Sequence, residues 1–166
     1  GQNAQGVLDM RTMFDFYDGG GLDMTVLGLA EVNAKGDINV GRFGPKNPGC
    51  GGFINISQNT HKAVFCGSFT AGGLEVEIGG GALHILKEGR NRKFVSQVQQ
   101  VTYSGEYGSS IGQDVTYVTE RAVFKLTREG LMLTEVAPGI NLQKDVLDQM
   151  GFEPILSKNL GLMDPR

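Results

Sequence analysis

Clusters of glycine divide this chain into short apolar runs. The sequence contains 26 glycines, and they gather at residues 19–21, 49–52, 72–73 and 79–81. Each cluster lies at a junction between apolar runs, where turn residues are expected. No fixed period links the clusters, so the pattern does not indicate a repeat protein. The glycines therefore predict many short elements joined by tight turns.

Most of the apolar runs have the length and composition of strands. Residues 24–32 (MTVLGLAEV) predict a buried strand, residues 35–37 a turn, and residues 38–40 a short returning strand. The other predicted strands are an interior strand at 63–68, a hairpin of 74–78 and 82–86, and neighbouring strands at 115–119, 122–126 and 131–136. Few strong helices accompany them. A complete doubly wound domain would have more, so we expect helices or a second layer to come from elsewhere.

The remaining segments give weaker patterns. Residues 53–58 predict a helical turn, and residues 94–101 fit either a short helix or a strand. Asn141 can cap a helix whose apolar positions follow at helical spacing. Residues 1–13 are expected to lie outside the core, residues 14–18 to end a strand with core aromatics, and the tail through Pro154 and Pro165 to form a surface extension.

Composition narrows the function classes. With 166 residues, 40% of them hydrophobic and 20% charged, the chain predicts one globular domain. A net charge of −3 argues against a nucleic-acid surface, and the basic residues of 87–93 (KEGRNRK) are better explained as a solvated turn. No apolar run approaches the roughly 20 residues of a membrane span, and no secretory signal is visible. Cys50 and Cys66 suggest neither a disulfide nor a zinc site, so we expect a reducing cytoplasm and no metal.

Residues 35–58 (KGDINVGRFGPKNPGCGGFINISQ) form a long, glycine-rich stretch that is poor in helix and strand formers until Phe53. Glycine lets a backbone turn through positive φ and approach a ligand without a Cβ in the way. Unpaired backbone N–H groups at the start of a helix also favour anions. Two interpretations stay open, a ligand-binding loop and a plain loop that uses glycine for turning. The stretch matches neither the Walker nor the dinucleotide pattern.

Several sequence blocks together resemble a known family. They are FDFYDGGGLD (14–23), VLGLAEVNAKGDINVGRFGP (26–45), GCGGFINISQN (49–59), FCGSFTAGG (65–73) and VTYVTERAVFKLTREGLMLTEVAPGI (115–140). In this order they resemble the C-terminal half of acetate/propionate-type CoA-transferases, the glutamate-dependent enzymes related to succinyl-CoA:3-ketoacid CoA-transferase. The resemblance implies a single α/β domain over residues 1–166, with an open, mainly parallel sheet and flanking helices.

The resemblance also implies a mechanism. A glutamate of the enzyme attacks an acyl-CoA thioester, an acyl-glutamyl anhydride forms, and a glutamyl-CoA thioester follows. A second carboxylate then takes the CoA. In this family the glutamate lies in a Glu-Ser-Gly or Glu-Asn-Gly type motif before the FDFYDGGG-like block, and these 166 residues contain no such motif. We therefore expect the N-terminal domain and the nucleophile to be absent from the chain, and the chain alone to be inactive, whether it is a cleaved piece or a recombinant fragment.

Part of the site is nevertheless expected here. The attack creates an oxyanion, which preorganised backbone N–H donors stabilise. The family's Gly-x-Gly-Gly block corresponds to residues 49–52, so the resemblance assigns this contact to Gly52, with Gly51 beside it and Gly49 in the substrate-binding loop. A side chain at position 52 would then occupy the place of the thioester. Cys50 is a spacer in this interpretation and not a nucleophile.

Two further residues correspond to the family's pattern. Asn39 could orient the acyl carbonyl or the attacking carboxylate, or could simply cap the neighbouring turn. Glu120 could hold the surrounding loop by accepting backbone hydrogen bonds, or could be a structural acid.

The implied partners are the N-terminal half of the same enzyme, acyl-CoA and a short-chain carboxylate such as acetate or propionate, with neither nucleic acid nor membrane. Coenzyme A is implied as a substrate, without any permanently bound cofactor, and a homo-oligomer is expected. Two alternatives remain open. One is an acyl-CoA hydrolase of the same fold, and the other is a non-catalytic α/β domain that binds a ligand or partner.

Overall fold

The main element of the fold is a six-stranded sheet. The structure, a computed structural model, describes residues 2–164. The strand order is β1 (Met24–Gly28), β4 (Lys62–Cys66), β9 (Asp114–Val118), β10 (Ala122–Thr127), β11 (Gly130–Val136) and β12 (Ile155–Leu162). The pairs β1–β4, β4–β9 and β11–β12 are parallel, whereas β9–β10 and β10–β11 are antiparallel. The predicted α/β architecture with an open, mainly parallel sheet is confirmed.

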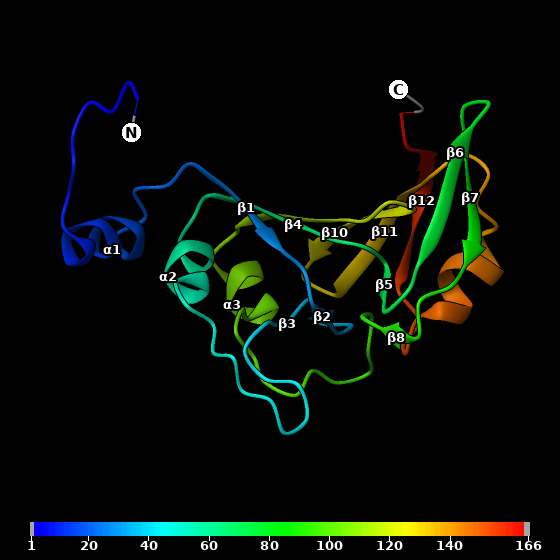
Figure 1. The fold of residues 1–166 in the computed structure, drawn as a ribbon, viewed down its shortest axis with the longest axis horizontal. Helices are drawn as coiled ribbons and strands as arrows, with labels where there is room; N and C mark the ends of the chain where they lie inside the picture. Colours follow the sequence, from blue (N-terminus) through cyan, green and yellow to red (C-terminus); the bar gives the residue numbers. More distant parts are fainter. Residues whose placement is uncertain (1, 165–166) are drawn as a thin grey trace.

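Short helices and two-stranded ribbons flank this sheet. The helices are α1 (Met10–Asp18), α2 (Phe53–Gln58) and α3 (Gly105–Ser110), with a π-helical turn η1 (Leu142–Val146) and a 3-10 turn η2 (Leu147–Gln149). The ribbons are β2 (Glu31–Val32) with β3 (Ile38–Asn39), β5 (Thr70–Ala71) with β8 (Asn91–Arg92), and β6 (Glu75–Gly79) with β7 (Ala82–Lys87). Helices α2 and α3 and the ribbon β2–β3 lie on one side of the sheet (Figure 1). Among the described helices, none is long and apolar enough to cross a membrane.

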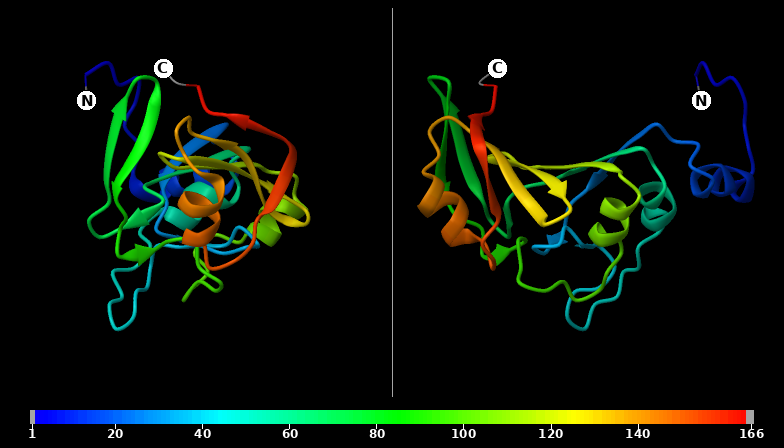
Figure 2. Two further views of the ribbon diagram at one scale, coloured as in Figure 1. Left: turned by 90° about the vertical axis from the view of Figure 1, so that its right-hand side faces the viewer. Right: turned by 180° about the vertical axis from the view of Figure 1, so that it is seen from behind.

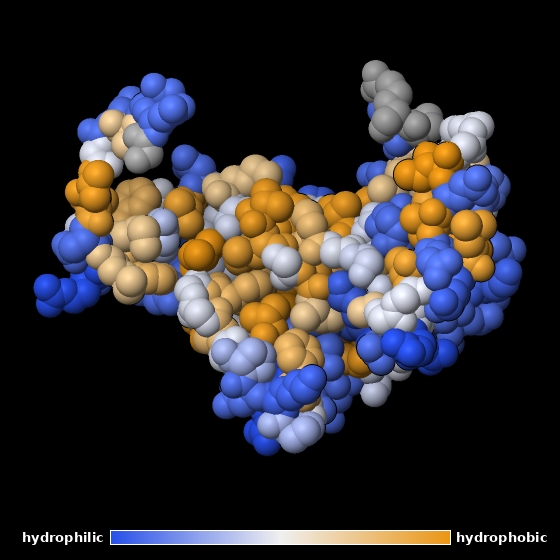
Figure 3. Space-filling model, in the orientation of Figure 1, coloured by the Kyte–Doolittle hydropathy of each residue, from blue (hydrophilic) through white to orange (hydrophobic). Residues whose placement is uncertain are grey.

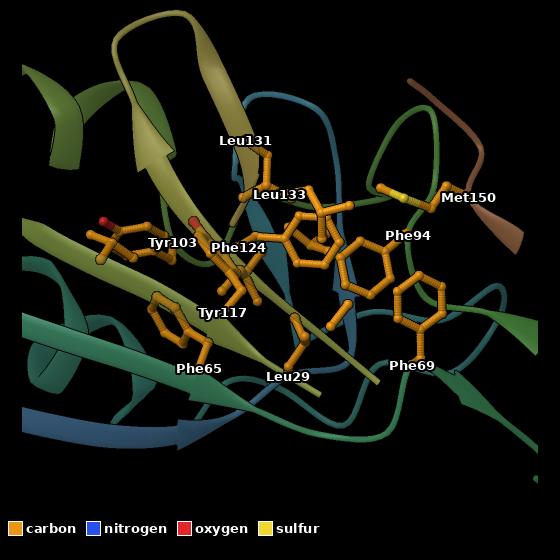
Figure 4. Packing of buried hydrophobic residues seen from close by; sticks show 14 of the residues in the cluster. Leu29, Phe65, Phe69, Phe94, Tyr103, Tyr117, Phe124, Leu131, Leu133 and Met150 are labelled. Atoms are coloured by element: carbon orange, nitrogen blue, oxygen red, sulfur yellow. The ribbon is translucent and has the colours of Figure 1, made fainter. Parts of the chain in front are cut away.

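The strand register aligns apolar side chains in rows on the face of the sheet that α2, α3 and the ribbon β2–β3 cover. Leu27, Phe65 and Tyr117 are Cα partners across β1, β4 and β9. Because successive side chains of a strand point to opposite faces, these three residues share a face. The ring centroids of Tyr103 and Tyr117 lie 4.9 and 5.5 Å from that of Phe65 (Figure 4). The ring of Phe53 from α2 stacks on Phe65 at 5.7 Å. This packing ties α2 and the segment before α3 to the sheet.

A second aromatic group continues the core beyond the carboxyl ends of β4 and β9. Phe94 stacks on Phe69 at 4.4 Å between centroids and lies 5.0 Å from Phe124 (Figure 4). All three side chains are fully buried. Residues 94–101 therefore contribute to the core, although the structure forms neither of the predicted elements there, only bends and an isolated bridge between Phe94 and Val32.

The other face of the sheet is poorly covered by the described residues. On edge strand β1, Met24 and Val26 are 51% and 59% exposed. Their neighbours in register, such as Val64 on β4, are only half-buried. Figure 3 shows hydrophobic residues gathered over the region of β1 and β4. Residues 24–32 are thus not one buried strand as predicted, because the chain leaves the sheet after Gly28 and β1 lies at the sheet edge.

The first helix also differs from the prediction. Residues 14–18 belong to α1, which contains no buried residue, and not to a strand with core aromatics. Helix α1 begins at Met10 because the carboxylate of Asp9, the residue before it, accepts hydrogen bonds from the backbone N–H groups of Arg11 and Thr12. Residues 2–13 lie outside the core as predicted, and α1 extends beyond α2 at one end of the molecule (Figure 2).

The C-terminal part follows the predictions only in part. Asn141 accepts a hydrogen bond from the backbone N–H of Lys144 and so caps the next element, as predicted. That element is a π turn followed by a 3-10 turn rather than a regular helix. The tail is not a surface extension, because it forms β12, which pairs in parallel with β11. The other predicted strands, the hairpin and the helical turn at residues 53–58 are confirmed.

Candidate functional site

The glycine-rich loop folds as a series of tight turns. Phe43 and Lys46 exchange backbone hydrogen bonds of 2.8 and 3.0 Å, and the N–H of Gly49 donates to the carbonyl of Gly41. Gly49 and Gly51 have positive φ angles of 80° and 53°, which an L side chain rarely adopts. The loop is therefore ordered by its own backbone, and its glycines are required for the turns themselves.

Asn39 is the anchor of this loop. Its side chain is fully buried. Its Oδ1 accepts hydrogen bonds from the N–H groups of Gly41 and Arg42, and its Nδ2 donates to the Glu31 carboxylate at 2.7 Å and to the Arg42 carbonyl. This is the capping role considered above. With both ends of its amide engaged, Asn39 acts on the loop through Glu31 and Gly41, and direct contact with a substrate stays a prediction.

The amides of Gly51 and Gly52 are placed differently. Gly52 is the residue before α2, and within residues 2–164 the N–H groups of Gly51 and Gly52 have no hydrogen-bond partner. Gly51 is exposed, whereas Gly52 is half-buried under the ring of Phe14 from α1. A Cβ on Gly52 would lie 2.9 Å from the Phe14 ring. The space beside Gly52 that was predicted to receive a thioester therefore borders on α1.

Glu120 belongs to a separate, charged cluster after β9. Its carboxylate accepts a 2.8 Å hydrogen bond from the backbone N–H of Phe69 and a 2.7 Å hydrogen bond from the Arg121 Nε. Glu120 thus holds the loop after β4 by accepting a backbone hydrogen bond, which is the contact expected for it. Among the described residues no hydrogen bond or ion pair joins Glu120 to residues 49–52.

Arg121 is the centre of this cluster, and sequence reasoning missed it. Its side chain is fully buried, its Nη1 lies 2.7 Å from the Glu88 carboxylate, and its Cζ lies 4.9 Å from the centroid of the Phe69 ring. Glu88 also accepts a hydrogen bond from Thr70. Burial alone would raise the pKa of Glu88, but the hydrogen bonds from Arg121 and Thr70 outweigh it, and the pKa lies below its usual 4.5. The cluster joins the ends of β4, β7 and β9.

Lys93 completes the charged set. It is 7% exposed, so the prediction of a solvated turn over residues 87–93 is wrong at this position, although Lys87 is exposed and pairs with Glu75. The Lys93 Nζ lies against Gly67, where a Cβ would come within 2.7 Å of it. Burial lowers the pKa of this ammonium, and the charge of Glu120 opposes the effect only in part.

A cleft of about 770 Å³ lies between Phe43 of the glycine-rich loop and the segment of residues 90–93. Its lining consists of residues 29–31, Phe43, Ala71 and residues 90–93. Glu31, whose carboxylate accepts a hydrogen bond from Asn39, lines this cleft. Lys93 lines it too, and the charge of Glu120 attracts its ammonium. Leu29 of the lining follows β1, and Lys93 of the lining lies against Gly67, which follows β4, so the cleft lies near the carboxyl ends of two parallel strands. Ligands of open α/β sheets bind at this edge.

Comparisons with known proteins agree with the sequence resemblance. No established protein-family profile matches the chain. It is 50% identical over 164 residues to acetate CoA-transferase YdiF of Escherichia coli O157:H7, covering 99% of this chain and 31% of that protein. It is 53% identical over 167 residues to caffeate CoA-transferase of Acetobacterium woodii, covering 98% of this chain and 32% of that protein. The chain thus spans about a third of the length of these relatives.

Solved structures give the same result. The crystal structure of the acyl-CoA transferase YdiF from E. coli O157:H7, a thioester complex with CoA, matches 98% of this chain and 32% of that chain with a TM-score of 0.95 and 50% identity. Glutaconate coenzyme A-transferase from Acidaminococcus fermentans matches with a TM-score of 0.70 at 16% identity, which shows the fold alone. The chain is therefore homologous over nearly its whole length to a segment of CoA-transferases, and this confirms the resemblance that its sequence motifs predicted.

Proposed function

We propose that the protein containing this chain transfers coenzyme A between carboxylic acids through a glutamyl-CoA thioester. The observation that carries the proposal is 50% identity with an acetate CoA-transferase over 99% of the chain, together with the match to a CoA-transferase crystallised as a CoA thioester. Acetate, propionate and similar short-chain acids are the proposed substrates. No feature of the cleft favours hydrolysis or a non-catalytic domain over transfer.

The proposed steps balance without any cofactor. A glutamate carboxylate attacks the acyl-CoA carbonyl, the C–S bond breaks, and CoA leaves as a thiolate from an acyl-glutamyl anhydride. The thiolate then attacks the glutamyl carbonyl and releases the acyl group as a carboxylate. An acceptor carboxylate then attacks the glutamyl-CoA thioester, releases the CoA thiolate and forms a second anhydride. The thiolate attacks the acceptor's acyl carbonyl, which gives the new acyl-CoA and restores the glutamate carboxylate. In each attack an oxyanion forms, for which the unpartnered N–H groups of Gly51 and Gly52 are the proposed donors.

Trapping the covalent intermediate tests this function. Incubating the protein in its natural length with acetyl-CoA and quenching it in acid should add the mass of CoA less water to one glutamate, located by peptide mass spectrometry. We expect that glutamate to lie outside residues 1–166. An adduct on a glutamate within this chain would contradict the placement of the nucleophile, and no adduct on any glutamate would refute the transferase. CoA release without an acceptor acid would indicate hydrolysis instead.

The poorly covered face of the sheet is a candidate surface for contact with another part of the same protein. An exposed apolar face with an unpaired edge strand invites association, and Met24 and Val26 of β1 are more than half exposed here. We propose that the N-terminal half of the same enzyme packs on this face. The amides of β1 should then be protected from hydrogen exchange in the protein of natural length, and rapid exchange along β1 would contradict the proposal. The expected homo-oligomer and cytoplasmic location stay predictions of the sequence.

A further inference from the structure

The Lys93 side chain is largely buried beside the cleft, and the acid that acts on its charge is Glu120. Among residues 2–164 its ammonium makes no hydrogen bond and no ion pair, although the residue is 7% exposed. Glu120, the acid closest to it electrostatically, is already bonded to Arg121 and to the Phe69 N–H. The Lys93 ammonium is not fully buried, because the residue lines the open cleft. Charges that are largely withdrawn from water are usually paired or bound to a ligand. The fold therefore holds this charge ready for a group that the chain does not itself supply.

The place of the ammonium indicates where that group would bind. Lys93 lines the cleft of about 770 Å³, and Arg90 and Arg92 line it too. Arg92 donates one hydrogen bond to the Asp148 carbonyl, and Glu31, the acid on the wall, accepts from Asn39. Gly67 leaves room for the ammonium at the end of β4, since a Cβ there would lie 2.7 Å from Nζ. The wall of this cleft thus carries three cations against one acid that is already bonded.

We propose that this cleft is an anion-binding subsite in which the Lys93 ammonium binds a carboxylate or phosphate oxygen of the substrate. The inference rests on the proposed function for the identity of the anion, because an acyl-CoA reaction offers both chemistries, the carboxylate of the acid and the phosphates of CoA. It deepens that function by assigning substrate recognition to a residue on this chain.

Binding of two simple probes to variants tests the subsite. Propionate and inorganic pyrophosphate would be titrated calorimetrically into the protein of natural length and into Lys93→Met, Lys93→Arg and Lys158→Met. Lys93→Met should weaken one of the two probes by about tenfold or more, and Lys93→Arg should retain binding within a few-fold. Lys158→Met is the matched control, because Lys158 is exposed on β12 at the other edge of the sheet. The probe that loses affinity identifies the anion.

A second measurement avoids any question of folding. In the unaltered protein, saturating probe should slow acetylation of Lys93 by an amine-reactive reagent several-fold, while acetylation of Lys158 stays unchanged. If neither probe slows labelling of Lys93, or a folded Lys93→Met binds both probes as tightly as the unaltered protein, the subsite does not exist. Both results are independent of the glutamyl-CoA adduct. An adduct without a Lys93 effect refutes the subsite alone, and a Lys93 effect without an adduct refutes the transferase alone.

Discussion

Replacing Arg121 with methionine is expected to lower the free energy of unfolding by about 3–5 kcal/mol, because it leaves two carboxylates near the core without their cation. Arg121 is fully buried and bonds both Glu88 and Glu120 at 2.7 Å. Methionine keeps most of the volume, so the loss reports charge rather than a cavity. Urea unfolding, followed by hydrogen exchange at the amides of β9 to β11, measures the change where it arises.

Two companions make the Arg121 result interpretable. Lys125→Met breaks an exposed ion pair with Asp114, also 2.7 Å long, and should cost less than about 1 kcal/mol. Glu88→Gln combined with Arg121→Met should recover part of the loss, since one uncompensated charge is removed. A cost for Arg121→Met no larger than that of Lys125→Met would show that the cluster does not stabilise the fold.

The same cluster sets a dependence on pH. The pKa of Glu88 is lowered in the folded state, so its contribution to stability is present above its usual value of 4.5 and is lost as the pH falls through the lower, folded value. The unaltered protein should therefore lose stability below about pH 4.5, and Arg121→Met should lose less over that range.

Replacing Gly52 with alanine is expected to slow formation of the glutamyl-CoA thioester by about 100-fold, comparable to the loss of one oxyanion-hole donor. Two physical causes could slow the reaction of this variant, and a second substitution separates them. The new Cβ would enter the space proposed for the thioester, but it would also lie 2.9 Å from the Phe14 ring. Phe14→Ala removes the second clash. If Gly52→Ala stays slow when combined with Phe14→Ala, the space beside Gly52 is needed for the reaction.

The opposite result has an equally clear meaning. Recovery of the double variant to within about threefold of Phe14→Ala would show that Gly52 serves only the packing of α1, and the oxyanion assignment would be wrong. Gly79→Ala is the matched control. Its Cβ would meet nothing within 4 Å, and Gly79 has no positive φ. Rates are followed by acid quench and intact mass, with thermal unfolding confirming that each variant is folded.

Local patterns in the sequence determined much of the fold. The glycine clusters marked the turns, apolar runs of strand length marked β4, β9, β10 and β11, and Asn141 marked the start of a helical turn. The CoA-transferase resemblance also came from sequence blocks. Patterns of this kind depend on each residue and its near neighbours, so they can be read without knowing which segments meet.

Only the tertiary structure decided what depends on distant contacts. Residues 155–162 have no clear strand pattern, and they form β12 because the edge of β11 is available for pairing. Lys93 lies in a run of polar residues typical of a turn, yet Phe94 beside it packs into the aromatic core and draws the lysine inward. Glu88 meets the neighbouring pair Glu120 and Arg121 only when the end of β7 comes close to the turn between β9 and β10. Burial of a charge is a property of the folded chain, and composition along the sequence does not contain it.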